Sequence, residues 1–245
     1  MTRRTLQRGK NVPGSGDLRV RLATADDEIP LQSLLSLAGY KLEQAQLDTL
    51  RTNKLATAIT AGLDAASAGN ATPVAEGLMT GLAREASSGP EEVHHCLMAT
   101  TLPLVAIDRN GAVVGASWSE PPERVIQALI TELGTTGSDA MEIYLRGCIG
   151  VSRFSAVAVD PSVRGQGLGA TLVRTTTKVL RQIGLRDIYG QIRESDQLER
   201  FYEQLGFAVL APGQPLDLSA VFGVARGPVP APGERLFHRS LSPIT

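Results

Sequence analysis

A glycine-rich turn is the segment of this 245-residue chain whose residue types and spacing suit chemistry. An apolar run over 154–159 predicts a buried strand before it, and a helical stripe from Leu172 to Ile183 predicts a helix after it. A turn that opens a helix offers unpaired amides and the positive end of the helix dipole to an anion. We therefore expect a phosphate or pyrophosphate to bind the residues of the turn, which are Arg164, Gly165, Gln166, Gly167, Leu168, Gly169 and Ala170.

The spacing of the glycines distinguishes this turn from the common nucleotide-binding turns. A P-loop needs a lysine directly after its last glycine, and none stands there. A dinucleotide-binding turn needs Gly-x-Gly-x-x-Gly with an acidic residue about 20 positions further on. Asp187 lies at a suitable distance, but the glycines follow the pattern Gly-x-Gly-x-Gly. A purely structural turn is the alternative to a ligand site.

A second segment, 201–207, reads Phe-Tyr-Glu-Gln-Leu-Gly-Phe. Together the two segments resemble the signatures V-x-x-x-x-R-G-x-G-x-G/A and F-Y-x-x-x-G-F of the GNAT superfamily of acyl-CoA N-acyltransferases. The first signature is matched at Val159, Arg164, Gly165, Gly167 and Gly169. The resemblance covers 17–240 and implies a GNAT fold of the α+β class. We expect three layers, with a mostly antiparallel mixed sheet, a V-shaped splay and helices on both faces.

The resemblance also implies how an acyl-CoA binds. Backbone groups of Val157, Ala158 and Val159 are expected to pair with the pantetheine amides in the splay, as an added strand would. The amides of 164–170 are expected to hold the pyrophosphate. Ser195, which stands where the family often has asparagine, is expected to cap the next helix and reach the pantetheine. The expected cosubstrate is acetyl-CoA, with no metal.

Tyr202 is the general acid that the resemblance implies. The family's tyrosine at this position protonates the leaving thiolate, and a phenol with a reference pKa of about 10 stays protonated at neutral pH. The alternative is a buried aromatic on an apolar helix face. Many members also carry a carboxylate on the strand before the glycine turn, but 152–155 reads Ser-Arg-Phe-Ser. Glu120 and Glu142 are the substitute bases that we consider, each with a solvated surface acid as the alternative.

The elements that position these residues are predicted from periodicity and turn chemistry. Asp-Arg-Asn-Gly at 108–111 predicts a tight hairpin between apolar strands over 102–107 and 112–118. Alternation predicts a strand over 18–22, which a capped helix over 24–38 follows. The other predicted helices cover 41–88, 123–133 and 195–205, and the other predicted strands cover 141–145, 188–192 and 234–239.

We predict one folded domain, because no composition shift or repeat divides the chain. Residues 1–16 are basic and end in Pro-Gly-Ser-Gly, which predicts a flexible arm before a single GNAT-type domain over 17–245. Insertions are expected at about 41–98 and 121–140, on the acceptor side. His94 and His95 are expected in a strand or loop, where adjacent side chains diverge and do not share a metal ion.

Composition places the chain among ordinary globular proteins. Its hydrophobic content of 42%, with 20% charged residues, excludes a disordered chain. Its net charge of −1 gives no overall positive potential that would attract nucleic acid or an anionic membrane. The sequence contains no apolar run of about 18 residues, so we predict no membrane span. Cys96 and Cys148 fit neither a disulfide framework nor metal-ligand spacing, so we expect buried thiols in the cytoplasm.

The sequence thus predicts an N-acetyltransferase that moves an acetyl group from acetyl-CoA to a primary amine by direct attack in a ternary complex. Three acceptors stay open: a small amine or antibiotic, a protein amine, and an aminoacyl-tRNA, which would make the protein a toxin. Residues 3–10 with Arg146 and Arg153 would contact RNA. A non-catalytic acyl-CoA sensor is the rival outside enzymes, and a homodimer is left open.

Overall fold

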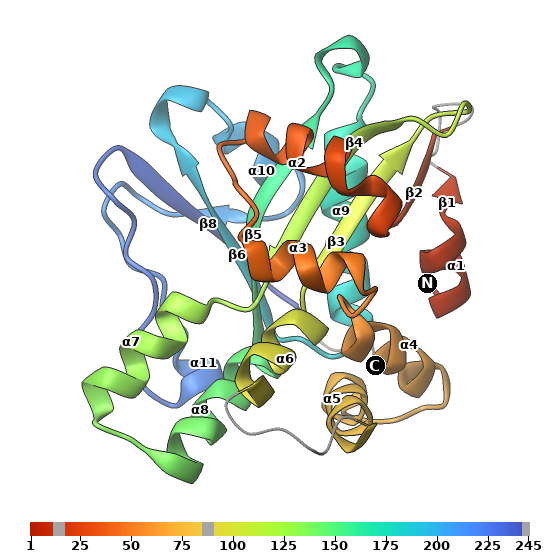
Figure 1. Cartoon of the computed structure of the whole chain (residues 1–245). Coiled ribbons are helices and arrows are strands. Elements are labelled where there is room, and N and C mark those ends of the chain that lie inside the picture. The colour runs from red at the N-terminus through yellow and green to blue at the C-terminus, as the bar shows by residue number, and fades with distance from the viewer. Residues whose placement is uncertain (12–17, 85–90, 242–245) are drawn as a thin grey trace.

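The centre of the molecule is a mixed β-sheet (Figure 1). The computed structural model describes residues 1–11, 18–84 and 91–241, and within them the strands follow the order β1-β2-β3-β4-β5-β6-β8-β7. Neighbouring strands are antiparallel except β5 and β6, which are parallel. The strands are β1 Lys10–Asn11, β2 Arg19–Leu22, β3 Leu102–Ile107, β4 Val113–Glu120, β5 Val151–Val159, β6 Asp187–Arg193, β7 Ala208–Val209 and β8 Glu234–Ser240.

Helices cover both faces of the sheet. Figure 1 shows α2 and α3 in front of it and α9 behind it, while α5, α6, α7, α8 and α11 gather at its lower end. The α+β class with a mostly antiparallel mixed sheet is therefore confirmed. The helices are α1 Arg3–Arg8, α2 Glu28–Leu37, α3 Gln44–Arg51, α4 Thr57–Ser67, α5 Pro73–Arg84, α6 Glu91–Ala99, α7 Glu123–Leu133, α8 Gly137–Gly150, α9 Leu168–Gln182, α10 Glu199–Gln204 and α11 Ser219–Phe222. Short 3₁₀ turns are η1 Ala25–Asp27, η2 Pro161–Val163 and η3 Glu194–Asp196.

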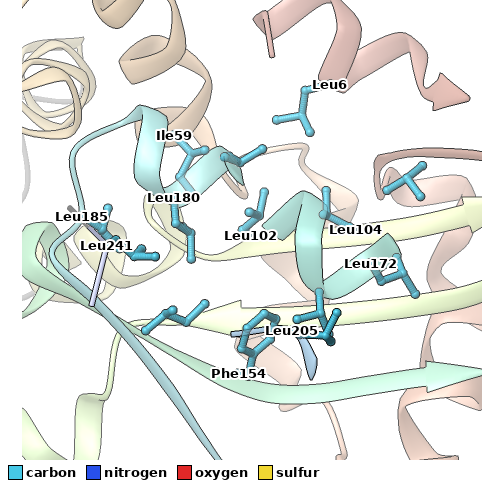
Figure 2. Close-up of a cluster of buried hydrophobic side chains, with 14 of the residues drawn as sticks. Leu6, Ile59, Leu102, Leu104, Phe154, Leu172, Leu180, Leu185, Leu205 and Leu241 are labelled. Atoms are coloured by element: carbon cyan, nitrogen blue, oxygen red, sulfur yellow. The ribbon is translucent and has the colours of Figure 1, made fainter. Parts of the chain in front are cut away.

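Three apolar cores hold the helices to the sheet, one on each face and one at its lower end. Behind the sheet, Leu172 and Leu180 of α9 pack with Leu104 of β3 and Phe154 of β5 (Figure 2). On the front face, the leucines of α2 cover a cluster that contains the fully buried Trp118 of β4. Side chains alternate between faces along a strand, so this central sheet is buried on both sides. The cores on the two faces fix the positions of β4 and β5, which carry the site.

The two parallel strands separate along their length. β5 and β6 pair from Val151 with Asp187 to Phe154 with Gly190 and no further. Beyond this point the two ribbons diverge in Figure 1. The register against β4 also shifts here, because successive β4 residues pair with Ala156 and Phe154 and leave Ser155 without a partner. The predicted V-shaped splay is present, and this bulge lies at its apex.

The prediction of a flexible arm over 1–16 is wrong for the part of it that the structure describes. Residues 3–8 form α1, whose first turn is capped by the Thr2 hydroxyl accepting from the amide of Thr5. Leu6 of this helix is 0% exposed and lies in the core behind the sheet (Figure 2). Burial of one leucine in that core outweighs the basic residues around it. Residues 12–16 of the predicted arm lie outside the described part.

The strand predicted over 141–145 is also wrong, because this segment lies in α8. Its buried residues Tyr144, Gly147 and Cys148 recur at helical spacing. A Cβ at Gly147 would overlap Ile126 of α7, so glycine allows the two helices to approach closely. The apolar run of 141–145 resembles a strand locally, and packing against α7 stabilises the helical conformation instead.

The histidine pair lies in α6, so the prediction of a strand or loop there is wrong as well. In the described ranges, no group of three or more His, Cys, Asp or Glu side chains is arranged to hold a metal ion.

No helix within these ranges has the length and apolarity to span a bilayer. Cys96 and Cys148 are buried free thiols, and burial raises the pKa of Cys148 well above its ordinary value.

Candidate active site

The glycine turn lies between β5 and α9. Gly165 and Gly167 have φ angles of 78° and 75°, in the left-handed region that favours glycine. The turn begins at Asp160, whose side chain accepts from the amide and the hydroxyl of Ser162. These hydrogen bonds lower the pKa of Asp160 and hold the entry to the turn.

The backbone amides of the turn are available to a ligand. The first helical hydrogen bond of α9 runs from the amide of Thr171 to the carbonyl of Gly167, at 3.0 Å. None of the described residues accepts from the amides of 165–170. The turn is exposed, and a Cβ at Gly165 or Gly167 would meet no atom within 4 Å. A ring of free amides at the start of a long helix suits a pyrophosphate.

The C-terminal half of β5 presents backbone groups to the splay. The amide of Asp160 donates to the carbonyl of Val114 in β4, and strand amides alternate in direction. Val157 and Val159 therefore face away from β4, and the Val159 carbonyl accepts from the Arg164 guanidinium at 3.0 Å. Ala158 pairs with Ala116 of β4, so its backbone groups do not face the splay as expected.

Tyr202 of α10 combines a core ring with an unpaired hydroxyl. It is 6% exposed, and its ring stacks on Phe237 with centroids 3.6 Å apart. Burial raises the pKa of Tyr202 above its ordinary value, and its hydroxyl has no hydrogen-bond partner among the described residues. A Cβ at Gly169 would lie 3.8 Å from Phe201 Cζ and 3.7 Å from Val159 Cγ2, so α10 borders both β5 and the glycine turn. A protonated phenol therefore lies beside the splay.

Glu120, at the end of β4, is the most densely bonded carboxylate of the site. The Trp118 indole donates to Oε2 at 2.7 Å, and the Gln46 amide donates to the same oxygen at 3.0 Å. The Tyr40 hydroxyl lies 2.9 Å from Oε1, and burial raises the pKa of Tyr40, so this phenol stays a donor. The Ser155 hydroxyl donates to Oε1 at 2.6 Å. These bonds hold the carboxylate in one orientation.

Ser155 is a functional candidate that the sequence did not reveal. β5 carries no carboxylate near the apex of the splay, and the bulge turns Ser155 towards Glu120 on the neighbouring strand. The two residues are 35 positions apart. A register shift brings them together, and local sequence patterns carry no signal for such a shift.

The two remaining predicted residues lie elsewhere. Glu142 is on the exposed side of α8, where its carboxylate pairs with Arg146 at 2.5 Å with side chains 60% and 49% exposed. It lines neither of the cavities described below. Ser195 lies in η3, four residues before α10 begins, and that helix has no side-chain cap. The prediction that Ser195 caps the helix is wrong.

Two cavities open next to the apex of the splay. The first, which we name the α3 cavity, holds about 410 Å³ and is lined by Tyr40, Gln46 and Glu120. The second, the α7 cavity, holds about 360 Å³ between α7 and the segment before β8. Arg124 and Arg153 line both cavities. Volumes of this size suit a small organic molecule.

Comparison with known proteins gives a family for the central segment. Residues 104–209 match the family model described as an acetyltransferase (GNAT) domain. This match confirms the resemblance for residues 104–209. No curated protein matches the chain.

Several solved structures align with this chain, each with a TM-score below 0.5. A GNAT-family acetyltransferase from Staphylococcus aureus Mu50 is 12% identical, with 92% of this chain and 99% of that one covered and a TM-score of 0.48. A phosphinothricin acetyltransferase from Sinorhizobium meliloti in complex with AcCoA is 15% identical over 92% and 89%, with a TM-score of 0.47. A nourseothricin acetyltransferase is 16% identical over 58% of this chain and 66% of that one, with a TM-score of 0.36.

Proposed function

We propose that this chain, whose residues 104–209 match the acetyltransferase (GNAT) domain model, is an N-acetyltransferase that uses acetyl-CoA and a primary amine. The observation that carries the proposal is the Ser155–Glu120 hydrogen bond of 2.6 Å at the apex of the splay. It supplies a path for the amine proton at the point where a thioester held along β5 would lie. In this proposal Ser155 and Glu120 supply the proton acceptor that the acyltransferase signature alone does not include.

The glycine turn and β5 bind the coenzyme in this proposal. The free amides of 165–170 hold the pyrophosphate, with the α9 dipole adding to their positive potential. The backbone groups of Val157 and Val159 pair with the pantetheine amides as an added strand would. This places the sulfur end of the coenzyme at the apex, between Ser155 and Tyr202.

Ser155 and Glu120 remove the proton of the attacking amine. The Ser155 hydroxyl accepts the amine proton and passes its own proton to Glu120 Oε1, while the amine nitrogen bonds to the thioester carbon. The other donors on Glu120 keep its oxygens oriented during this transfer.

Tyr202 protonates the leaving sulfur as the carbon–sulfur bond breaks. Because burial raises the pKa of Tyr202, this hydroxyl holds its proton at neutral pH until a thiolate develops beside it. The products are the acetylated amine and the free thiol of the coenzyme. The proton balance closes when Glu120 returns its proton to solvent and Tyr202 regains one.

The acceptor in this proposal is a small molecule or a protein amine. The two cavities of about 410 Å³ and 360 Å³ favour a compact acceptor. The arginines considered for RNA do not form one surface, since Arg3 pairs with Asp64 at 3.0 Å and Arg146 pairs with Glu142 at 2.5 Å. Arg153 is half-buried at the cavities instead.

The test of this function is thiol release from acetyl-CoA with a panel of primary amines. We expect Ser155→Ala and Glu120→Gln each to lower kcat by about 10²- to 10⁴-fold, the usual contribution of a proton-transfer group. Glu142→Gln is the matched control, and we expect it to retain full activity because that carboxylate is exposed on α8. If the wild-type protein binds coenzyme but none of the amines causes thiol release, the protein is a sensor and the proposal is refuted.

A further inference from the structure

Arg153 is a half-buried cation whose charge has no ion-pair partner among the described residues. Its Nη2 donates to the Gln191 amide oxygen at 3.1 Å, and its Nε is buried without any hydrogen-bond partner. No described carboxylate forms an ion pair with it, whereas Arg226 nearby pairs with Glu132 at 2.7 Å. A buried guanidinium donor left unpaired is costly, so its retention indicates a partner that arrives with a ligand.

The position of Arg153 relates it to the proposed reaction. It lies two residues before Ser155 on β5 and pairs in register with Glu120 of β4. Its side chain lines both cavities, so a ligand in either one reaches the guanidinium. Residues two apart on a strand are about 7 Å apart, so a group bound to Arg153 lies close to the apex where the amine would attack.

The α7 cavity combines this cation with apolar walls. Val125 and Leu129 of α7 line one side, and Tyr189 of β6 and Val229 line the other. The Arg226 guanidinium on its rim is neutralised by Glu132, so the cavity offers Arg153 and Arg124 to an anion. An occupant that suits both features carries one small anion and one apolar group.

We propose that Arg153 binds the carboxylate of the acceptor, and that the acceptor is an apolar amino acid or a close amino-carboxylate. This inference rests on the proposed acetyl transfer, whose substrate class it names. A guanidinium offers pairs of N–H groups in a planar fork, which match a carboxylate with two parallel hydrogen bonds. The apolar side chain of the acceptor then occupies the α7 cavity, and its amine is directed to Ser155.

The test compares amines that differ only in the carboxylate. Leucine and 3-methylbutylamine form one pair, and phenylalanine and 2-phenylethylamine form another. We expect wild-type protein to acetylate the amino acids with a kcat/KM about 10- to 100-fold higher than the matched amines, the range expected for hydrogen bonds to a charged group. Arg153→Met is expected to remove this preference by lowering kcat/KM for the acids alone. Arg146→Met, an exposed control on α8, is expected to keep it.

The outcomes separate this inference from the function on which it rests. Equal turnover of acids and matched amines, or a preference that survives Arg153→Met, would overturn the carboxylate site and leave acetyl transfer standing. If no amine is acetylated, calorimetry with N-acetylleucine decides, in the presence of coenzyme. Binding that Arg153→Met weakens supports the anion site without the reaction, and binding that it leaves unchanged refutes the site.

Discussion

Replacing Tyr202 by phenylalanine separates the chemistry of the hydroxyl from the packing of the ring. Phenylalanine keeps the ring that stacks on Phe237 at 3.6 Å. The hydroxyl has no described partner and is not among the buried unpaired polar atoms, so the change removes no hydrogen bond from the fold. We therefore expect the free energy of unfolding to change by less than about 1 kcal/mol. For a chain of this size, this corresponds to a shift of Tm of less than about 2–4 °C.

The expected loss lies in the chemical step. A general acid contributes about 10²- to 10⁴-fold, or about 2.7–5.4 kcal/mol of transition-state stabilisation. We expect kcat for thiol release at saturating coenzyme and amine to fall within this range, with coenzyme affinity by calorimetry unchanged. Because burial raises the pKa of Tyr202, the wild-type rate should show no loss of the protonated acid as pH rises to about 10.

Tyr144→Phe is the matched control for this experiment. Tyr144 is also buried, at 5% exposure, but it lies on α8 within the core at the lower end of the sheet. We expect this variant to retain the wild-type kcat. If Tyr202→Phe keeps kcat within about twofold of wild type while Tyr144→Phe behaves the same, the general-acid role is refuted. Tyr202 is then a core aromatic only.

Two further predictions concern the glycine turn and α1. Gly167→Asp is expected to abolish coenzyme binding in calorimetry without loss of the folded state. Asp and Asn tolerate the φ of 75° at this position, so Gly167→Asn, with the same shape and no charge, is expected to bind far more tightly. Equal affinity of the two variants would contradict the assignment of the turn. Leu6→Ala is expected to lower the free energy of unfolding by about 2–5 kcal/mol in urea titrations, because Leu6 is 0% exposed. A change below about 0.5 kcal/mol would mean that α1 is not docked in solution.

The parts of the fold with strong local signals were predictable from the sequence. The hairpin between β3 and β4 has Asp108 and Gly111 at its turn, and the α7 bounds Glu123–Leu133 agree with the prediction. The glycine turn likewise combines a strand end, positive-φ glycines and a helix start in one short segment. Such signals do not depend on distant residues.

The parts that the sequence did not predict depend on tertiary packing. Residues 3–8 are polar apart from Leu6, and only the core behind the sheet explains why they form a helix. α8 has a strand-like apolar run, and its helix is selected by close approach to α7. Ser155 faces Glu120 because a bulge shifts the register of two strands that are distant in the chain. Each outcome depends on contacts between distant segments.

The central claim is acetyl transfer to an amine, and its most direct measurement quantifies both products in the same reaction. Wild-type protein is incubated with acetyl-CoA and an amino acid, and released thiol and acetylated amine are measured together by mass spectrometry. We predict equal amounts of the two products, with both formed far more slowly by Ser155→Ala. Thiol release without acetylated amine, or coenzyme binding without thiol release, would contradict the claim.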